Sequence, residues 1–316
     1  YFIVFQSALN GKNETMIKIK NTDQWEQVER QLKENESFRH PDLFVFIAKI
    51  LSYDKNIRPG RYLIDQKHST LDAVRKLRNG QQDPVKFVIN NITFPEQLAS
   101  RVSQKLDIDS TAFMHYIAQT QNAEKYGLDI NHFFGMFLCN TYEIYWNTSL
   151  EDFVDKMHQE YQRFWNADRM QKAAQLGFKP EEVIVLASIV QKETNHQPEF
   201  GTVASVYLNR IRIGMPLQAD PTVKYALKDL SIKRILNKDL QTDSPYNTYK
   251  YRGLPPGPIG LPESNVINGV LNAPINNYLY FCAVFGSGKH VFSTTYSEHL
   301  TNARAYQKSL NEEKIY

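Results

Sequence analysis

The sequence is poor in cysteine. Only two of its 316 residues, Cys139 and Cys282, are cysteines, and both lie in apolar stretches, GMFLCN and LYFCAVF. Two cysteines lack the spacing of a zinc site, so we expect buried thiols instead. A disulfide between them stays open because sequence separation alone does not exclude one. Cysteine usage therefore leaves the cellular compartment undecided.

Long apolar runs and long charge runs are also missing. No stretch reaches the roughly 18 to 20 apolar residues of a membrane span. The first five residues are nevertheless apolar (YFIVF), which leads us to predict that residues 1–15 are the tail of an N-terminal membrane anchor. The net charge is +3, with no run of five like charges and no basic stripe interleaved with aromatic residues, so we expect no nucleic-acid partner.

Several catalytic signatures are absent. The sequence contains no GxSxG, GxGxxG, GxxxxGK[ST] or HExxH motif, which argues against a serine hydrolase, a nucleotide-binding protein and a zinc peptidase. The candidate metal ligands His196, His290, Glu298 and His299 do not have paired-ligand spacing. We therefore predict no metal and no cofactor.

Length and composition indicate a globular protein of about two domains. Hydrophobic residues make up 42% of the chain and charged residues 22%. The 18 Tyr and 18 Phe suit contact with sugar rings, and they suit a bulky hydrophobic core equally well.

Residues 16–83 are predicted to form a small α+β module. Residues 16–20 (MIKIK) alternate as a strand, Asp23 and Glu26 suggest a capping box for the first helix, Pro41 starts a second helix, and residues 61–64 (RYLI) return as a strand. A further helix is expected after Ser69. The βααβ order resembles a LysM-type module, a fold associated with glycans that contain N-acetylglucosamine. The alternative is a spacer with no ligand.

Residues 84–316 are predicted to form a larger mixed α+β catalytic domain. Residues 110–172 are expected to be a helical, aromatic insert, with a capping box at Thr148 and Glu151. Within it, residues 143–148 (EIYWNT) are a candidate wall of a sugar groove. Further predictions are a charged peripheral helix at 228–240, a rigid proline-rich loop at 244–262, a buried strand at 277–285 paired with 290–294, and a C-terminal helix at 298–310.

The stretch 181–221 carries the most informative residue, Glu193. Val183, Leu186 and Val190 recur at helical spacing, and Glu193 continues that apolar stripe. Apolar neighbours disfavour a charged carboxylate and raise its pKa, so that it can protonate a leaving oxygen near neutral pH. Glycoside cleavage requires such an acid.

A second carboxylate would distinguish hydrolysis from a reaction without water. Asp220 is the candidate, although Asp before Pro221 is a common turn residue and can cap a helix that begins near Thr222. If Asp220 is structural, one acid suffices. It protonates the glycosidic oxygen and then, as the conjugate base, deprotonates the 6-hydroxyl of the same sugar, which closes an internal ring.

Six ordered motifs carry a resemblance to a known family: LASIVQKET, VYLNRIRIGMPLQADPTVKYA, SPYNTY, GLPPGPIGLP, YLYFCA and GKHVFSTTYSEH. The chain resembles the YceG-like endolytic murein transglycosylases. The resemblance implies that Glu193 is the catalytic acid and base. It also implies a cleft that is formed by Gln218, Asp220, Thr222, Tyr246, Asn247, Thr248, Tyr249 and His290.

The resemblance further implies cleavage of MurNAc-β-1,4-GlcNAc bonds inside nascent glycan strands, with formation of 1,6-anhydroMurNAc ends. It implies a single-pass protein of the cell inner membrane with its catalytic part in the periplasm, and partners among peptidoglycan synthases or the division machinery. The chain departs from the family pattern at Gln191, where an acidic residue often stands, and in its YWNTS segment. The alternatives are a lysozyme-like hydrolase that uses Glu193 and Asp220, and a non-catalytic glycan-binding scaffold.

Overall fold

The fold is α+β, as predicted, and the described residues form helices and three small two-stranded sheets. The computed structural model describes residues 3–232 and 234–312. By contacts the chain divides into two compact units. The first comprises Tyr1–Val88, Ala99–Phe113 and Thr141–Phe153, and the second comprises Ile89–Leu98, Met114–Asn140 and Val154–Tyr316.

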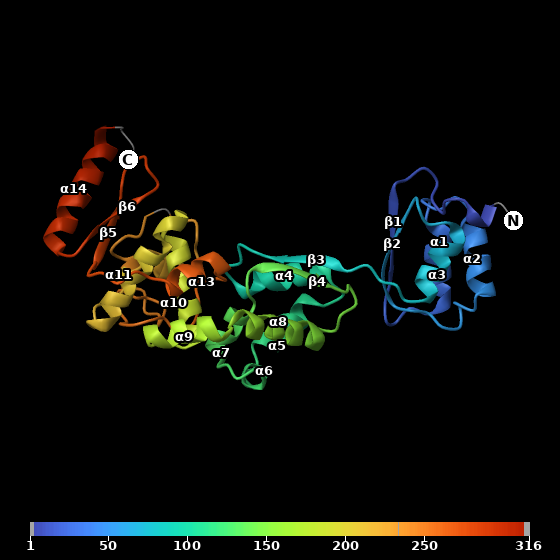
Figure 1. Cartoon of the computed structure of the whole chain (residues 1–316), viewed down its shortest axis with the longest axis horizontal. Helices are drawn as coiled ribbons and strands as arrows, with labels where there is room; N and C mark the ends of the chain where they lie inside the picture. The colour runs from blue at the N-terminus through green and yellow to red at the C-terminus, as the bar shows by residue number, and fades with distance from the viewer. Residues whose placement is uncertain (1–2, 233, 313–316) are drawn as a thin grey trace. The chain divides into compact units, whose positions relative to one another are not determined.

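The N-terminal part of the first unit has three helices on one face of a two-stranded sheet (Figure 1). Its elements are η1 (Ile3–Phe5), β1 (Glu14–Ile19), α1 (Trp25–Glu34), α2 (Pro41–Ile50), β2 (Gly60–Asp65) and α3 (Thr70–Arg78). β1 and β2 are antiparallel, with Glu14 opposite Asp65 and Ile19 opposite Gly60. The predicted strand–helix–helix–strand order is confirmed, and the LysM assignment stays a prediction.

Alternation along the two strands builds the core of this module. Ile17 and Ile19 on β1, and Tyr62 and Ile64 on β2, are fully buried, because every second side chain of a strand points to the same face. They pack in one hydrophobic cluster with buried residues of α1, α2 and α3.

The helix starts of the module differ in part from the sequence prediction. Asp23 is not the capping residue: its carboxylate accepts a hydrogen bond from the Lys20 N–H and closes the turn before the helix. Gln24 occupies the N-cap position instead, in a reciprocal pair with Gln27. The predicted Ser69 cap is confirmed, since the Ser69 hydroxyl accepts from the Asp72 N–H.

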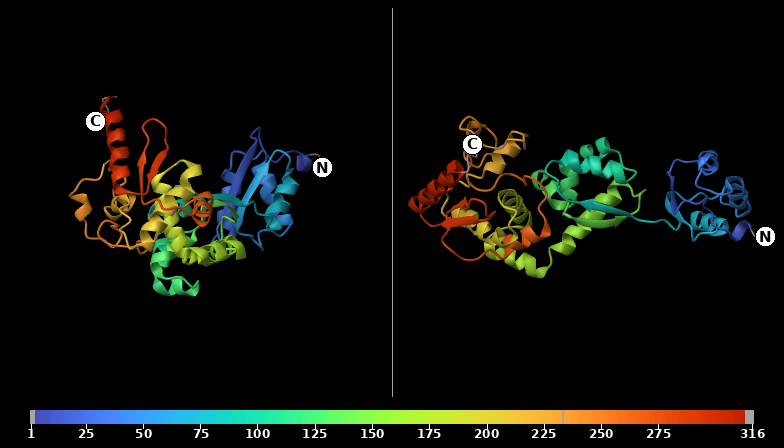
Figure 2. Two further views of the ribbon diagram at one scale, coloured as in Figure 1. Left: turned by 60° about the vertical axis from the view of Figure 1, so that its left-hand side comes forward. Right: turned by 90° about the horizontal axis from the view of Figure 1, so that it is seen from above.

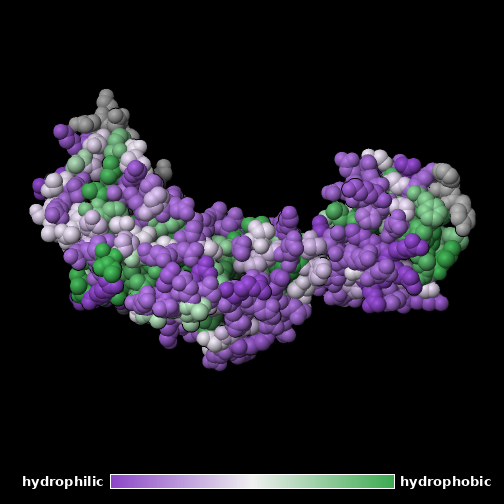
Figure 3. Space-filling model, viewed as in Figure 1, coloured by the Kyte–Doolittle hydropathy of each residue, from purple (hydrophilic) through white to green (hydrophobic). Residues whose placement is uncertain are grey.

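Among the described residues of the module, several large apolar side chains stay exposed, and three of them are more than half exposed. Phe5, Phe46 and Ile50 are 63%, 60% and 62% exposed. Figure 3 shows a hydrophobic region at the end of the module where η1 and α2 lie. None of the helices in residues 3–232 and 234–312 is long and apolar enough to cross a membrane.

The segment 110–172 is not wholly helical. It contains β4 (Asn140–Ile144), which pairs with β3 (Val85–Ile89) from an earlier part of the chain. Helix α4 (Pro95–Lys105) precedes the segment. The other elements are α5 (Ser110–Ile117), α6 (Thr120–Lys125), α7 (Ile130–Phe133), η2 (Phe134–Met136), α8 (Leu150–Phe164) and α9 (Ala167–Leu176), which begins within the segment. The predicted Thr148 cap of α8 is wrong by one residue, because the Ser149 hydroxyl accepts from the Asp152 N–H.

Of the two rings in the EIYWNT segment, Tyr145 is 53% exposed and Trp146 is buried, and the wall of a sugar groove stays a prediction. Trp146 is 6% exposed, and the ammonium of Lys18 lies 5.3 Å from the centre of its ring. The indole therefore packs within the first unit. The segment belongs to that unit, whereas Glu193 belongs to the second.

The second unit is built around α10 (Pro180–Glu193). Every residue from 183 to 190 is buried, and the helix contacts α9, α11 (Phe200–Arg212), α12 (Asp220–Ala226) and α13 (Ser264–Leu271). The sequence predicted an apolar stripe on one side of this helix. In the structure other helices enclose α10 over these two turns, so the buried surface is wider than that stripe.

The C-terminal segment is a hairpin with a helix beside it (Figure 2). β5 (Tyr280–Ala283) pairs with β6 (His290–Ser293), and α14 (Tyr296–Glu312) contacts both strands. The predicted hairpin is confirmed, but β5 is only half-buried.

Two irregular regions, residues 228–240 and 244–262, lie between α12 and α13 in the sequence. The predicted helix at 228–240 is wrong: its described residues form turns that lead into the short turn η4 (Asp239–Gln241), with most side chains partly or fully exposed. The segment 244–262 has neither helix nor strand, as predicted for its prolines. Cys139 and Cys282 are not joined in a disulfide, and of the two only Cys139 is buried.

Candidate active site

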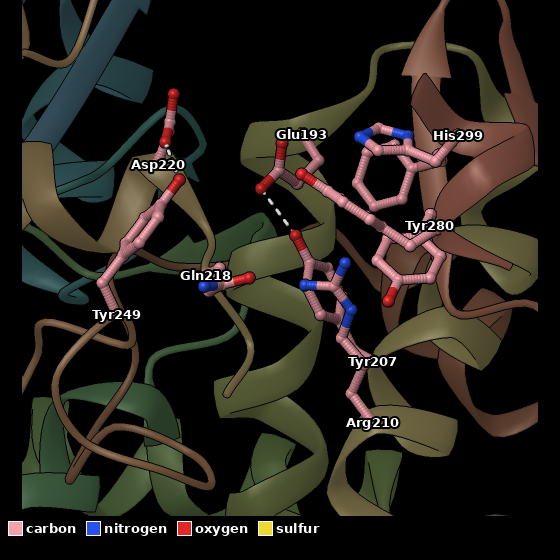
Figure 4. A pocket seen from close by; sticks show the side chains of 10 residues that line it. Glu193, Tyr207, Arg210, Gln218, Asp220, Tyr249, Tyr280 and His299 are labelled. Carbon is pink, nitrogen blue, oxygen red and sulfur yellow. Dashed lines mark hydrogen bonds between the residues drawn. The ribbon is translucent and has the colours of Figure 1, made fainter. Parts of the chain in front are cut away.

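Glu193 is the last residue of α10, and its side chain lines a cavity although other residues surround most of it. Its side chain is half-buried, and its Oε1 accepts a hydrogen bond of 2.7 Å from the Tyr207 hydroxyl (Figure 4). Tyr207 comes from α11 and is itself only 1% exposed. The adjacent helices α10 and α11 therefore fix both partners of this contact.

The surroundings of Glu193 raise its pKa from 4.5 to about 7. Burial is the main cause, the hydrogen bond from Tyr207 opposes it, and the negative charge of Asp220 adds to it. The position at the helix C-terminus acts in the same direction as burial, since the negative end of the helix dipole disfavours a carboxylate there. At neutral pH the group can thus both give and take a proton.

The cavity beside Glu193 has a volume of about 320 Å³ and is lined mainly by polar and aromatic side chains. The lining consists of Glu193, Tyr207, Arg210, Gln218, Asp220, Tyr249, Tyr280, Phe281, Tyr296 and His299. In the view of Figure 4, Glu193 lies between Asp220 and Tyr249 on one side and Tyr280 and His299 on the other. Glu193 and the predicted residues Gln218, Asp220 and Tyr249 are thus brought together.

A strained turn presents two of these residues. Gln218 has φ +50°, a left-handed conformation that a non-glycine residue adopts only where the surroundings hold it. Its N–H donates to the Thr248 carbonyl over 3.1 Å, which fixes the turn. Next to it, Asp220 accepts a 2.5 Å hydrogen bond from the Tyr249 hydroxyl. Asp220 makes no capping hydrogen bond to α12, whose N-cap is Ala219.

Three further predicted residues are buried beneath the turn instead of lining the cavity. Thr222, Asn247 and Thr248 are at most 1% exposed. The hydroxyls of Thr222 and Thr248 are 2.9 Å apart, and the Asn247 amide donates to the carbonyls of Leu240 and Thr242. These side chains hold the polar loop together from inside.

Tyr246 and His290 lie away from this first cavity. Tyr246 packs against Tyr225, with ring centres 4.9 Å apart. The Nδ1 of His290 lies 2.8 Å from the Glu199 carboxylate, and its ring lines a second cavity of about 440 Å³. Glu193 also lines that second cavity, so it borders open space on two sides.

Arg210 is a site residue that the sequence analysis missed. It is 8% exposed, and its guanidinium donates to the carbonyls of Leu217 (2.6 Å) and Leu279 (2.7 Å). The central carbon of the Arg210 guanidinium also lies 5.3 Å from the centre of the Tyr280 ring. Arg210 therefore connects the turn that carries Gln218 to the start of β5. Its place on an otherwise apolar helix face is the feature of the sequence from which it could have been predicted.

Tyr280, Tyr296 and His299 were missed as well. Tyr280 and His299 stack with ring centres 5.3 Å apart, and Tyr296 lies 5.7 Å from Tyr280. Because they come from β5 and the start of α14, only the hairpin brings their rings together. Within residues 3–232 and 234–312, no group of three or more His, Cys, Asp or Glu is placed to hold a metal ion.

Comparison with known proteins agrees with the resemblance. A model of the YceG-like family matches residues 17–305. This chain belongs to the YceG-like family. A crystal structure of a yceG-like protein from Listeria monocytogenes is similar to the chain at a TM-score of 0.62 and 25% identity, over 92% of this chain and 99% of that one.

Two curated relatives of this YceG-like protein bear the name endolytic murein transglycosylase. The one from Bacillus subtilis (strain 168) is 36% identical over 172 residues, which are 52% of this chain and 45% of that protein. The one from Streptococcus pneumoniae (strain D39) is 25% identical over 339 residues, 95% of this chain and 60% of that protein. The chain thus spans about half to three fifths of these relatives.

Proposed function

We propose that this chain is an endolytic murein transglycosylase that cleaves peptidoglycan strands internally, with Glu193 as general acid and then general base. The observation that carries the proposal is the carboxyl group of Glu193, with a pKa of about 7, on the border of two cavities. An enzyme that cuts inside a strand must accommodate sugars on both sides of the broken bond. Family membership and the names of the two relatives agree with this activity.

In the proposed reaction the protonated Glu193 donates its proton to the glycosidic oxygen, and the bond from that oxygen to C1 of the MurNAc residue breaks. The resulting carboxylate takes the proton of the 6-hydroxyl of the same sugar, and O6 bonds to C1. Glu193 ends as it began, and no water is consumed. A pKa near the working pH suits a group that acts in both directions.

The placement of Asp220 supports one alternative, a lysozyme-like hydrolase with Glu193 as acid and Asp220 as second carboxylate. Asp220 lines the same cavity and does not cap α12, so the structural role considered from sequence is not the one observed. Its oxygen instead accepts from Tyr249, an arrangement that orients the carboxylate. The hydrolase uses a water molecule, whereas the transglycosylase does not.

Mass spectrometry of the products of purified glycan strands decides between these reactions. We expect fragments with 1,6-anhydroMurNAc ends, each lighter by one water than a reducing end. Glu193→Gln, which keeps the size of the side chain but cannot release a proton, is the matched control and is expected to give no products. Reducing ends would support the hydrolase. Activity in the Gln variant would refute the role of Glu193, and binding without any new ends would favour a scaffold.

Because the proposed substrate is peptidoglycan, we propose that the chain acts on the extracytoplasmic side of the membrane. Four further statements stay predictions: a membrane anchor at residues 1–15, a ligand for the module at residues 16–83, a catalytic domain at residues 84–316, and partners among synthases or the division machinery. Full-length protein in membrane fractions, with truncation of the N-terminal segment as the control, tests the anchor.

A further inference from the structure

A third cavity lies beside the residues that follow Glu193. It has a volume of about 440 Å³ and is lined from the last turn of α10, the loop after it and the start of α13. It shares Thr194 and Asn195 with the second cavity, which in turn shares Glu193 with the first. The three cavities therefore adjoin one another in series, with Glu193 between the first and the second.

The third cavity is unusually rich in side-chain amides. Its lining includes Asn91, Gln191, Asn195, Gln197 and Asn265. Gln191 and Asn265 use their oxygens to accept backbone N–H groups. Within the described part of the chain, Asn91, Asn195 and Gln197 make no side-chain hydrogen bond, so both their donors and their acceptors face solvent.

The backbone at Asn91 follows β3 in a left-handed conformation, with φ +50°. Asparagine adopts this conformation more readily than most other non-glycine residues. The side chain of Asn91 joins the lining of the cavity from this position.

The remaining lining is close to neutral in charge. Lys192 donates to the Thr93 hydroxyl over 3.0 Å, and Glu263 supplies one negative charge. Phe200 and Val266 are buried and form apolar parts of the wall. A strongly charged ligand finds no matching cluster in this lining. A neutral ligand that alternates N–H donors and carbonyl acceptors matches the free amides.

We propose that this cavity is a remote subsite that binds amide groups of the peptidoglycan strand, namely the acetamido groups of its sugars or the amide bonds of its attached peptides. The inference rests on the proposed function for the identity of the strand. It adds a place where the enzyme holds the polymer away from the bond that is cut.

Binding by a cleavage-silent protein tests the subsite. The full chain with Glu193→Gln is titrated with purified glycan strands, once with their peptides and once after enzymatic removal of the peptides. Asn91→Gly, Asn195→Ala and Gln197→Ala are then added together. Glycine tolerates the backbone angle at position 91, and the other two side chains are exposed and unbonded, so the fold is expected to persist. Gln175→Ala, an exposed amide on α9, is the matched control.

We expect the triple change to weaken binding about eightfold or more, at roughly a factor of two to ten for each of three lost hydrogen bonds. The Gln175 change is expected to leave binding as it was. Weakening with both kinds of strand assigns the acetamido groups, and weakening only with peptide-bearing strands assigns the peptides. Unchanged binding of both strands by the triple variant overturns the subsite. If that variant does not fold, Gln197→Ala alone serves, because Gln197 lines the third cavity and not the second, with a smaller expected effect in the same direction. Because binding is read without cleavage, this outcome is separate from the product masses that test the proposed function.

Discussion

Replacing Tyr207 by phenylalanine removes one hydroxyl and leaves the ring in place. That hydroxyl donates to Glu193 Oε1 over 2.7 Å and holds the pKa of the carboxyl below the value that burial alone would impose. The ring packs edge-on against Phe281 with centres 6.0 Å apart, a contact that phenylalanine keeps. The substitution therefore changes the proton affinity of Glu193 with little change in shape.

The size of the effect follows from the difference between two hydrogen bonds. A bond to a charged group contributes about 1.5 to 3 kcal/mol and one between neutral groups about 0.5 to 1.5 kcal/mol. Losing the Tyr207 bond therefore penalises the carboxylate by about 1 to 1.5 kcal/mol more than the neutral acid. Since 1.36 kcal/mol corresponds to one pH unit, the pKa of Glu193 rises by about one unit.

The assay is the pH dependence of kcat/KM on glycan strands. Glu193 must be protonated to start the reaction, so activity declines as pH rises through its pKa in the free enzyme. In the phenylalanine variant this decline is expected about one pH unit to the alkaline side of the wild-type decline. A decline at the wild-type position, or on the acid side of it, would refute the assignment of Glu193 as the acid that Tyr207 modulates.

Three further predictions concern the same site. Glu193→Gln should be as stable as the wild type at pH 4 and more stable by up to roughly 3 kcal/mol at pH 8. The pKa of Glu193 is about 7 in the folded state and 4.5 in the unfolded state, so the stability of the wild type falls as pH rises between these values. Urea denaturation at both pH values measures the difference. Asp220→Asn removes a charge that raises the pKa of Glu193, so the alkaline decline in kcat/KM should move to lower pH with activity retained, whereas the hydrolase alternative requires near-complete loss. Arg210→Met loses two hydrogen bonds to backbone carbonyls and should destabilise the fold by about 3 kcal/mol in thermal or urea unfolding, and a stability equal to that of the wild type would contradict its proposed link between the turn and β5.

Local signals predicted most of the secondary structure correctly. Alternation predicted the strand β1, and β2 was predicted as the strand that returns beside it. The pair Ser69 and Asp72 marked the start of α3, and the prolines of residues 244–262 excluded helix and strand. These features depend on residues within a few positions of one another. The predicted helix at 228–240 failed because its pattern was charged and lacked a buried face to hold it.

Cap positions were less predictable than the elements themselves. Asp23 and Thr148 each had the right residue type at the right spacing, but Gln24 and Ser149 provide the observed caps. Neighbouring polar side chains compete for the same N–H groups within one or two positions. The strand β4 was missed because it needs β3, some fifty residues earlier, to form its ladder.

The sequence singled out Glu193 as the candidate acid because its place at the end of an apolar helix is a local property. The sequence by itself determined that this residue is an acid among apolar neighbours and that polar, proline-bounded clusters follow it. The tertiary structure alone decided which of those polar residues reach it: Asp220 and Tyr249 line its cavity, while Thr222 and Thr248 are buried below. Residues that are close together in the sequence can point to opposite sides of a turn. The conformation of the folded turn therefore decides which of their side chains faces the cavity.

The same limit applies to Arg210, Tyr280 and His299. They come from α11, β5 and α14, and a folded hairpin is required to bring them to one wall. Composition and spacing describe each segment alone, whereas a site depends on which faces of distant segments meet. Burial, which raises the pKa of Glu193 to about 7, likewise arises only when helices enclose α10.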